Sequence, residues 1–344
     1  ASFKIDSVAP DTTYSLSGTP GSGGWYVSPV TVSLSASDAT SGVGSTTLDG
    51  TSYTGARTSS VEGTHTISFY STDAAGNTET DESAAFKIDT IPPATTASLS
   101  GTAGTNGWYR SPVTVSLAAS DSASGVNSTT LDGTPYSGAR TYSAEGTTTI
   151  DYASLDNAGN AESTESTTFK VDTVAPSTTG SVSGSLRASG WYTSSVTLTL
   201  NASDAASGVD IMYVDGAVYT APVVYTTDGN HTHTYYSTDA AGNIETAGTA
   251  TFRIDGTAPT TRLSTTGQPG NNGWYISPVT VSASATDSAS GVSQVFLSLD
   301  RLPLAGTVSL EAEGDYLITF YAVDNAGNTE VASSATLRLD LNPP

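Results

Sequence analysis

The chain carries the stretch Tyr70-Ser-Thr-Asp-Ala-Ala-Gly-Asn-Thr-Glu79, and its polar residues recur in the same order three more times. The copies are Asp156-Asn-Ala-Gly-Asn-Ala-Glu162, Asp239-Ala-Ala-Gly-Asn-Ile-Glu245 and Asp324-Asn-Ala-Gly-Asn-Thr-Glu330. An alternating apolar run precedes the first copy and another β-type run follows it, which predicts the turn of a β-hairpin with Gly76 at positive φ. Because a catalytic loop occurs once per active site, four copies indicate a repeated building block.

The spacing of the aromatic anchors gives the length of that block. Trp25, Trp108, Trp191 and Trp274 lie 83 residues apart each time. This period exceeds the roughly 20 to 50 residues of a solenoid repeat and suits a self-contained β domain. We therefore predict four domains, at residues 7–89, 90–172, 173–255 and 256–344, called repeats 1 to 4 below. Residues 1–6 match the end of a repeat and are interpreted as the closing strand of a preceding one.

The composition excludes several classes of function. The chain has no Cys, so disulfide and thiolate chemistry is excluded. Its 33 acidic and 11 basic residues give a net charge of −22, which argues against nucleic acid and anionic membrane surfaces as partners. No apolar run reaches transmembrane length. The acidic balance favours solubility and cation binding.

The clearest strand signal is Val30-Thr-Val32-Ser-Leu34-Ser-Ala36, in which every second residue is apolar. This alternation is typical of a strand with one buried and one wet face. About seven such short strands per repeat, with almost no helical periodicity, predict an all-β fold. The expected architecture is a tandem array of four immunoglobulin-like β-sandwich domains.

The linkers between repeats are short and contain proline, as in Asp6-Ser-Val-Ala-Pro10 and Asp89-Thr-Ile-Pro-Pro93. Proline fixes its own φ and holds the preceding residue in an extended conformation. Neighbouring domains should therefore adopt few relative orientations, which predicts a semi-rigid rod.

Several motifs together support a family resemblance. They are Gly24-Trp-Tyr-Val-Ser-Pro-Val-Thr-Val32, Ser37-Asp-Ala-Thr-Ser-Gly-Val43, Leu48-Asp-Gly50, Asp73-Ala-Ala-Gly-Asn-Thr-Glu79 and the closing Phe86-Lys-Ile-Asp89. With them the chain resembles, over essentially its whole length, the bacterial Ig-like repeats of large secreted and surface-anchored proteins. The resemblance implies a sandwich fold, an extracellular or cell-surface location and a spacer, adhesive or fibre-forming role. It implies no particular ligand. The fourth repeat departs from the pattern at Leu299-Asp-Arg301, which leaves its middle hairpin to be tested.

Aspartates end two apolar rows in each repeat, as Asp38 and Asp73 do in repeat 1. In an Ig sandwich these strands lie in opposite sheets and end at the same pole, where the linker also arrives, so the carboxylates should meet. Oxygen ligands on loops suit Ca²⁺. The candidate ligands are Asp38, Asp73, Asp89, Asp121, Asp156, Asp172, Asp204, Asp239, Asp287 and Asp324. The alternative, which the spacing favours, is that each Asp caps its own loop through backbone N–H groups.

The tryptophans allow two interpretations. Aromatic rings exposed at regular intervals can stack on sugar rings, which would make Trp25, Trp108, Trp191 and Trp274 a glycan-binding array. The favoured alternative is that each tryptophan covers an edge of a small core or packs at a junction.

The sequence thus predicts a non-enzymatic extracellular structural protein. It would be the stalk of an adhesin or the repeating part of a surface filament, and an array of carbohydrate-binding modules is the alternative. No cofactor is required, with Ca²⁺ the one candidate. The expected partners are further copies of the repeat or chain and cell-surface or matrix components. The segment Ser2–Asp6 should expose Phe3 and Ile5, and such an unpaired strand could add to a neighbouring copy. The favoured alternative is that the segment is the end of a longer array of the same repeat.

Overall fold

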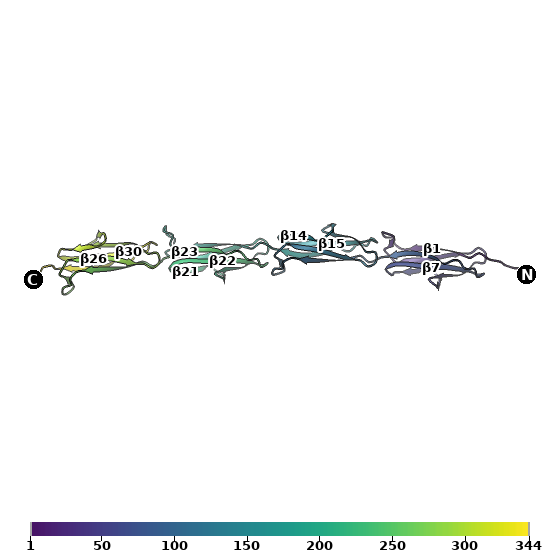
Figure 1. Ribbon diagram of the computed structural model, residues 1–344, viewed down its shortest axis with the longest axis horizontal. Helices are drawn as coiled ribbons and strands as arrows, with labels where there is room; N and C mark the ends of the chain where they lie inside the picture. Colours follow the sequence, from purple (N-terminus) through teal and green to yellow (C-terminus); the bar gives the residue numbers. More distant parts are fainter. Residues whose placement is uncertain (1, 343–344) are drawn as a thin grey trace. The chain divides into compact units, whose positions relative to one another are not determined.

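The computed structural model describes residues 2–342, so residue 1 of the predicted first segment and residues 343 and 344 of the predicted last domain lie outside it. Every regular element within that range is a β-strand. Residues 2–342 accordingly contain no helix of the length and apolarity needed to cross a membrane. The chain divides into two compact units, one ending at Thr173 and the other beginning at Val174, and each unit holds two repeats (Figure 1).

The strands follow one another in the same order in every repeat, except that repeat 3 lacks the two-residue second strand. Repeat 1 has β1 (Asp11–Ser17), β2 (Trp25–Tyr26), β3 (Val30–Ser37), β4 (Val43–Leu48), β5 (Thr51–Ser52), β6 (Arg57–Ser59), β7 (Gly63–Asp73) and β8 (Glu82–Ile88). Repeat 2 has β9 (Ala94–Ser100), β10 (Trp108–Tyr109), β11 (Val113–Ser120), β12 (Val126–Leu131), β13 (Thr134–Pro135), β14 (Arg140–Tyr142), β15 (Gly146–Asp156) and β16 (Glu165–Val171). Repeat 3 has β17 (Ser177–Ser183), β18 (Val196–Ser203), β19 (Val209–Val214), β20 (Ala217–Val218), β21 (Val223–Tyr225), β22 (Gly229–Asp239) and β23 (Gly248–Ile254). Repeat 4 has β24 (Thr260–Thr266), β25 (Trp274–Tyr275), β26 (Val279–Thr286), β27 (Val292–Leu299), β28 (Leu302–Leu304), β29 (Val308–Leu310), β30 (Gly314–Asp324) and β31 (Ser333–Leu339).

Two sheets make up each repeat. In repeat 1, β3 lies between β1 and β6 in one sheet, and the other sheet has the order β2-β8-β7-β4-β5. All of these pairs are antiparallel except β2 with β8, which is parallel. In repeat 3 the two-residue strand is reduced to a parallel bridge between Tyr192 and Ile254. This confirms the predicted all-β array of four immunoglobulin-like β-sandwich domains.

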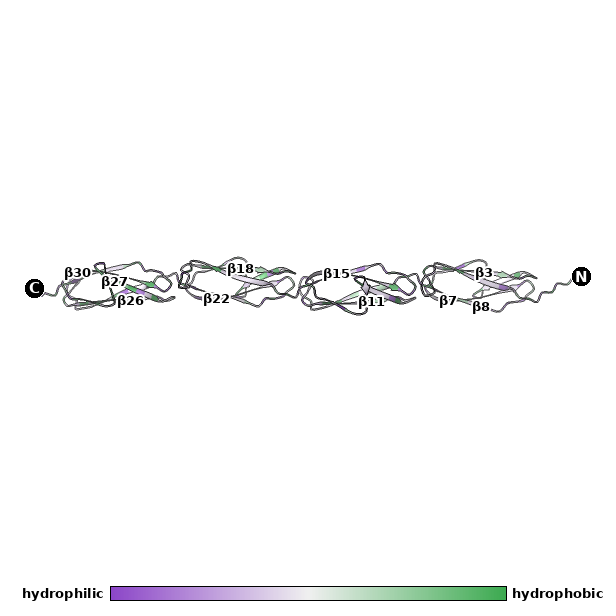
Figure 2. Ribbon diagram, turned by 90° about the horizontal axis from the view of Figure 1, so that it is seen from above, coloured by the Kyte–Doolittle hydropathy of each residue, from purple (hydrophilic) through white to green (hydrophobic). Residues whose placement is uncertain are grey.

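The core of each sandwich comes from the alternating strands. In repeat 1, Val30 and Val32 of β3 are 0% and 3% exposed and pack with Ile67 and Phe69 of β7, as the two-residue period predicts. Figure 2 shows the apolar stretches of such strands in green. Repeat 3 differs, because His233 stands where repeat 1 has Ile67 and its buried residues form two separate clusters.

The repeated turn connects β7 to β8, and Gly76 has a φ of 97°, which confirms the predicted hairpin with positive φ. The middle hairpin of repeat 4 also forms, between β27 and β28. Its first strand has eight residues against six in β4, so the two extra residues lengthen this strand. At its tip Arg301 has a φ of 70° at the place where Gly50 stands in repeat 1.

The first residues of the chain are not part of a sheet. Residues 2–10 form no strand, and the side chains of Phe3 and Ile5 are 89% and 85% exposed. Addition of this segment to another copy stays a prediction.

Candidate metal centres at the repeat junctions

Three aspartates meet at the N-terminal pole of repeat 1. Asp38 follows β3 of the three-stranded sheet, Asp73 ends β7 of the five-stranded sheet, and Asp6 comes from the segment before β1. One carboxylate oxygen from each lies within 4.8 Å of the others. The strand order therefore brings Asp38 and Asp73 together as the sequence predicts.

The same arrangement recurs within each unit. The carboxylates of Asp89, Asp121 and Asp156 converge in unit 1, and those of Asp255, Asp287 and Asp324 converge in unit 2. In repeat 3 the carboxylates of Asp204 and Asp239 also lie within 4.8 Å of each other. Asp172 precedes the boundary between the units, at the linker position that Asp89 has. Sequence reasoning missed Asp6 and Asp255 as members, although both start the same Pro-containing linker as Asp89.

Each loop aspartate also caps its own loop. Asp121 Oδ1 accepts the Gly125 amide at 2.6 Å, and Asp156 Oδ1 accepts the Asn160 amide at 2.7 Å. Asp73 accepts two bonds from Asn77, one from the amide and one from the side chain. Burial alone would raise the pKa of Asp73, but these hydrogen bonds outweigh burial and lower it. The hydrogen bonds of the Asx-turn interpretation are thus observed directly, and the bonds to Asp121 use its Oδ1.

Repeat 1 leaves two polar atoms of this pole unsatisfied. Asp6 Oδ2 and Ser41 Oγ are buried and have no hydrogen-bond partner within residues 2–342. In repeat 2 the corresponding atom, Asp89 Oδ2, accepts the Ser124 amide at 3.0 Å. In repeat 1 the equivalent amide, that of Ser41, donates to Asp38 at 2.8 Å and not to Asp6. A buried carboxylate oxygen without a partner is costly unless a cation or water supplies one.

The linker aspartate joins neighbouring repeats through its backbone as well. The Asp89 amide donates to the Tyr26 carbonyl of repeat 1 at 2.9 Å, and the Asp89 carbonyl accepts Asn160 Nδ2 of repeat 2, also at 2.9 Å. Thr90 donates its amide to Glu62 at 2.9 Å. In unit 2 the Asp255 amide and carbonyl make the corresponding bonds, to the Tyr192 carbonyl and from Asn328 Nδ2. These linkers are therefore parts of both flanking sandwiches.

Unit 1 has one more contact across its junction. The Ser22 amide, in the glycine-rich loop of repeat 1, donates to the Ala158 carbonyl of repeat 2 at 2.7 Å. A Cβ added at Gly21 would lie 2.4 Å from that carbonyl oxygen. This approach requires glycine at position 21.

The glutamate of the repeated turn has a structural role that the sequence did not predict. Glu79 accepts the Thr12 amide at 2.9 Å, the Thr12 hydroxyl and the Ser71 amide at 2.5 Å. Thr12 lies on β1 and Ser71 on β7, so one carboxylate links the two sheets. Glu162, Glu245 and Glu330 do the same in the other repeats. The signal available in the sequence was that a threonine and a glutamate recur together, 67 residues apart in repeats 1 to 3 and 69 apart in repeat 4.

The four tryptophans lie beside the last strand of their repeats. The parallel pairing of β2 with β8 places Trp25 opposite Lys87, whose Nζ is 5.3 Å from the ring centroid. Lys170 and Arg253 cover Trp108 and Trp191 in the same way. Trp191 is 9% exposed and Trp274 36%, with Trp25 and Trp108 half-buried. A cation occupies one face of three of these rings, and stacking on sugar stays a prediction.

No protein-family model and no curated protein matches the chain. Among solved structures it is similar to a tetra-tandem repeat in the extending region of a large adhesion protein, with 19% identity, 96% of this chain and 99% of that chain covered, and a TM-score of 0.33. It is also similar to Sidekick-1 immunoglobulin domains 1–4, with 12% identity, 98% of this chain and 100% of that chain covered, and a TM-score of 0.29. A third similar structure is that of the fibronectin(III)-like modules of Clostridium thermocellum CbhA, with 13% identity, 47% of this chain and 94% of that chain covered, and a TM-score of 0.23. With TM-scores this low, none of them indicates a function for this chain.

Proposed function

We propose that this chain is a non-enzymatic extracellular structural protein, a semi-rigid rod of Ig-like repeats that serves as an adhesin stalk or as the repeating part of a surface filament. The observation that carries the proposal is the linker aspartate. Asp89 binds Tyr26 on one side and Ser124 and Asn160 on the other, so the linker is held by both sandwiches. A spacer needs this property, since a loosely tethered array would not hold a distal domain away from a surface.

The proposal predicts a narrow distance between repeats 1 and 2. The chain has no Cys, so the exposed strand residues Ser15 and Ser98 can be changed to Cys and spin-labelled without competing thiols. Pulsed electron paramagnetic resonance should give a single narrow distance distribution. Asp89→Gly should broaden it, because the side-chain bond to Ser124 is lost and glycine frees the linker backbone. A broad distribution in the parent chain would contradict a semi-rigid rod.

We further propose that the aspartate clusters bind Ca²⁺. The donor set fits, since it consists of carboxylate oxygens on loops, the ligands that Ca²⁺ prefers. The orphaned Asp6 Oδ2 and Ser41 Oγ support a cation at the pole of repeat 1. Convergent carboxylates repel one another, and a divalent ion would offset this repulsion. Where a linker aspartate takes part, the ion would also bind two repeats to each other.

Calorimetry tests the Ca²⁺ proposal. Ca²⁺ should raise the melting temperature relative to chelator, because a ligand of the folded state stabilises it by mass action. Asp38→Asn should reduce the number of sites by one, whereas Asp81→Asn, in the exposed part of the turn, should leave the binding stoichiometry unchanged. Equal melting with Ca²⁺ and chelator, with no heat of binding, would leave the aspartates as loop caps only.

A further inference from the structure

One core-facing position differs among the repeats in the size of its side chain. It is the residue that pairs with the first valine of the central strand, and it is Ser59, Tyr142, Tyr225 or Leu310 in repeats 1 to 4. The aromatic or aliphatic side chain packs against the core in repeats 2, 3 and 4. Serine in repeat 1 leaves the corresponding space without a side chain of that size.

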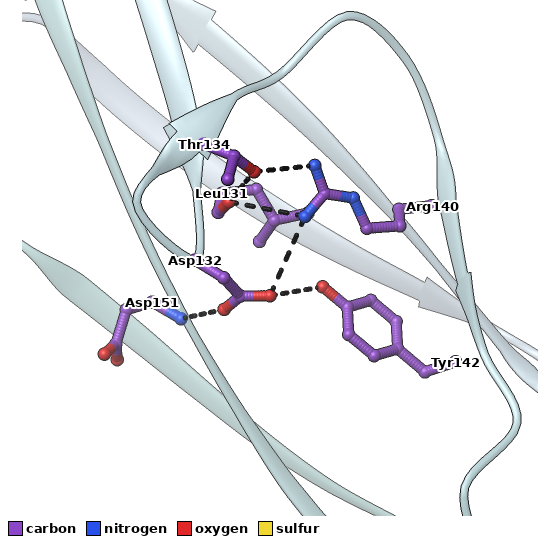
Figure 3. Close-up of polar contacts among 6 residues, drawn as sticks. All are labelled: Leu131, Asp132, Thr134, Arg140, Tyr142 and Asp151. Atoms are coloured by element: carbon purple, nitrogen blue, oxygen red, sulfur yellow. Dashed lines mark hydrogen bonds and ion pairs between the residues drawn. The ribbon is translucent and has the colours of Figure 1, made fainter.

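Repeat 2 shows what this space accommodates. The ring of Tyr142 lies 5.6 Å from that of Phe169 in an edge-on arrangement, and its hydroxyl donates to Asp132 Oδ2 at 2.6 Å. Figure 3 shows the Tyr142 hydroxyl and the Arg140 guanidinium meeting the same carboxylate. Burial and the hydrogen bond to Asp132 raise the pKa of Tyr142, so the phenol is neutral at physiological pH.

In repeat 1 the equivalent place is a cavity of about 170 Å³. The core side chains Val32, Leu48, Ile67 and Phe86 form its apolar wall. For comparison, an apolar protein cavity of about 150 Å³ takes up benzene. The cavity is therefore large enough for one aromatic ring.

The polar end of this cavity matches that of repeat 2. Asp49 Oδ1 accepts the Ser68 amide at 2.8 Å, as Asp132 Oδ1 accepts the Asp151 amide at 3.1 Å. Asp49 Oδ2 is the counterpart of the atom that receives the Tyr142 hydroxyl, and the Asp49 side chain is exposed, so this oxygen can accept a donor from solution. Arg57 corresponds to Arg140 and lines the same cavity, held by the Leu48 carbonyl. The cavity of repeat 1 therefore has an apolar wall and, at one end, a carboxylate oxygen that can accept a hydrogen bond.

We propose that the cavity of repeat 1 binds a para-substituted phenol. The ring lies among Val32, Ile67 and Phe86, and the hydroxyl donates to Asp49 Oδ2 in the way that Tyr142 donates to Asp132. A small phenolic compound and the tyrosine side chain of a partner peptide share this chemistry. The site is independent of the Ca²⁺ clusters and of the linkers.

The probe is 4-methylphenol, the tyrosine side chain without its backbone, titrated into the full chain by NMR and calorimetry. The expected result is one site, with shifts confined to repeat 1. Toluene should bind about fivefold more weakly, the ratio that one net hydrogen bond contributes. Asp49→Asn should reduce the preference for 4-methylphenol over toluene.

Two reciprocal variants locate the site. Ser59→Tyr should fill the cavity with its own ring and abolish binding, and Tyr142→Ser should create a second site in repeat 2. Both residues occur naturally at this position of the fold, and melting curves check that each variant is folded. Absence of binding to the parent chain, or unchanged binding to Ser59→Tyr, would overturn the proposal.

An acetylated and amidated Gly-Tyr-Gly peptide distinguishes the two sources of the phenol. Tighter binding of the peptide than of 4-methylphenol indicates a tyrosine of a protein partner, and weaker binding indicates a small phenolic compound.

Discussion

At the residue scale, the glutamate of the repeated turn joins the two sheets in a chain that has no disulfide to do so. Burial alone would raise the pKa of Glu330, but the hydrogen bonds from Thr261 and Ala322 outweigh burial and lower it. A carboxyl group with a lowered folded-state pKa stabilises the fold above its unfolded pKa of about 4.3. That stabilisation is lost as the pH falls through the folded pKa.

Glu330→Gln should therefore lower the free energy of unfolding of repeat 4 by about 1 kcal/mol at neutral pH. The loss of stability should shrink as the medium is acidified below the unfolded pKa. Urea unfolding followed through the NMR signals of repeat 4 measures both effects. Glu311→Gln is the matched control, since Glu311 is exposed in the same repeat. Equal effects of the two substitutions would contradict the link between sheets.

Arg301 is the second residue with a specific energetic consequence. Its φ of 70° is in the left-handed region, which costs a non-glycine residue about 1–2 kcal/mol. Gly50 and Gly133 hold this place in repeats 1 and 2 with φ of 68°. Arg301→Gly should stabilise repeat 4 by about 0.5–1 kcal/mol after the greater flexibility of glycine in the unfolded chain is counted. The reverse change, Gly50→Arg, should destabilise repeat 1, and urea unfolding of both variants tests the pair.

At the scale of elements, the glycine-rich loop of repeat 1 contributes to the junction in unit 1. A methyl group at Gly21 would collide with the Ala158 carbonyl, which is backbone and cannot rotate away. Gly21→Ala should therefore separate the loop from repeat 2 and broaden the distance distribution between labels at positions 15 and 98. Gly55→Ala, where an added Cβ meets nothing within 4 Å, should leave the distribution unchanged. Equal distributions in both variants would show that the loop contact does not hold the junction.

The fold could be predicted because strand periodicity is visible in the sequence. The link between the sheets and the cavity of repeat 1 could not, because they depend on which side chains meet across strands. The shared parity of Val30, Val32 and Leu34 identified the core strand, and the Ig strand order placed Asp38 and Asp73 at one pole. The link between Thr12 and Glu79 joins residues 67 positions apart, so no local pattern revealed it. The cavity at Ser59 depends on comparing one position across four repeats after the register is known. The linker aspartates Asp6 and Asp255 were missed although their positions match that of Asp89.

At the scale of the whole molecule, the proposed function depends on how far the junctions hold the repeats in line. Asp89 fixes one junction in unit 1 and Asp255 fixes one in unit 2, each through hydrogen bonds to both neighbours. The linker Asp172-Thr-Val-Ala-Pro176 has the same composition. If all linkers behave alike, we predict that the four sandwiches extend end to end.

Small-angle X-ray scattering of the full chain tests this most directly. At about 3.3 Å per strand residue, a sandwich built on an 11-residue strand such as β7 is about 35–40 Å long, so four in line span on the order of 150 Å. We predict a maximum dimension of that size, with the profile of a cylinder that keeps its length when Ca²⁺ is present. A compact particle with a maximum dimension near half that length would contradict the rod.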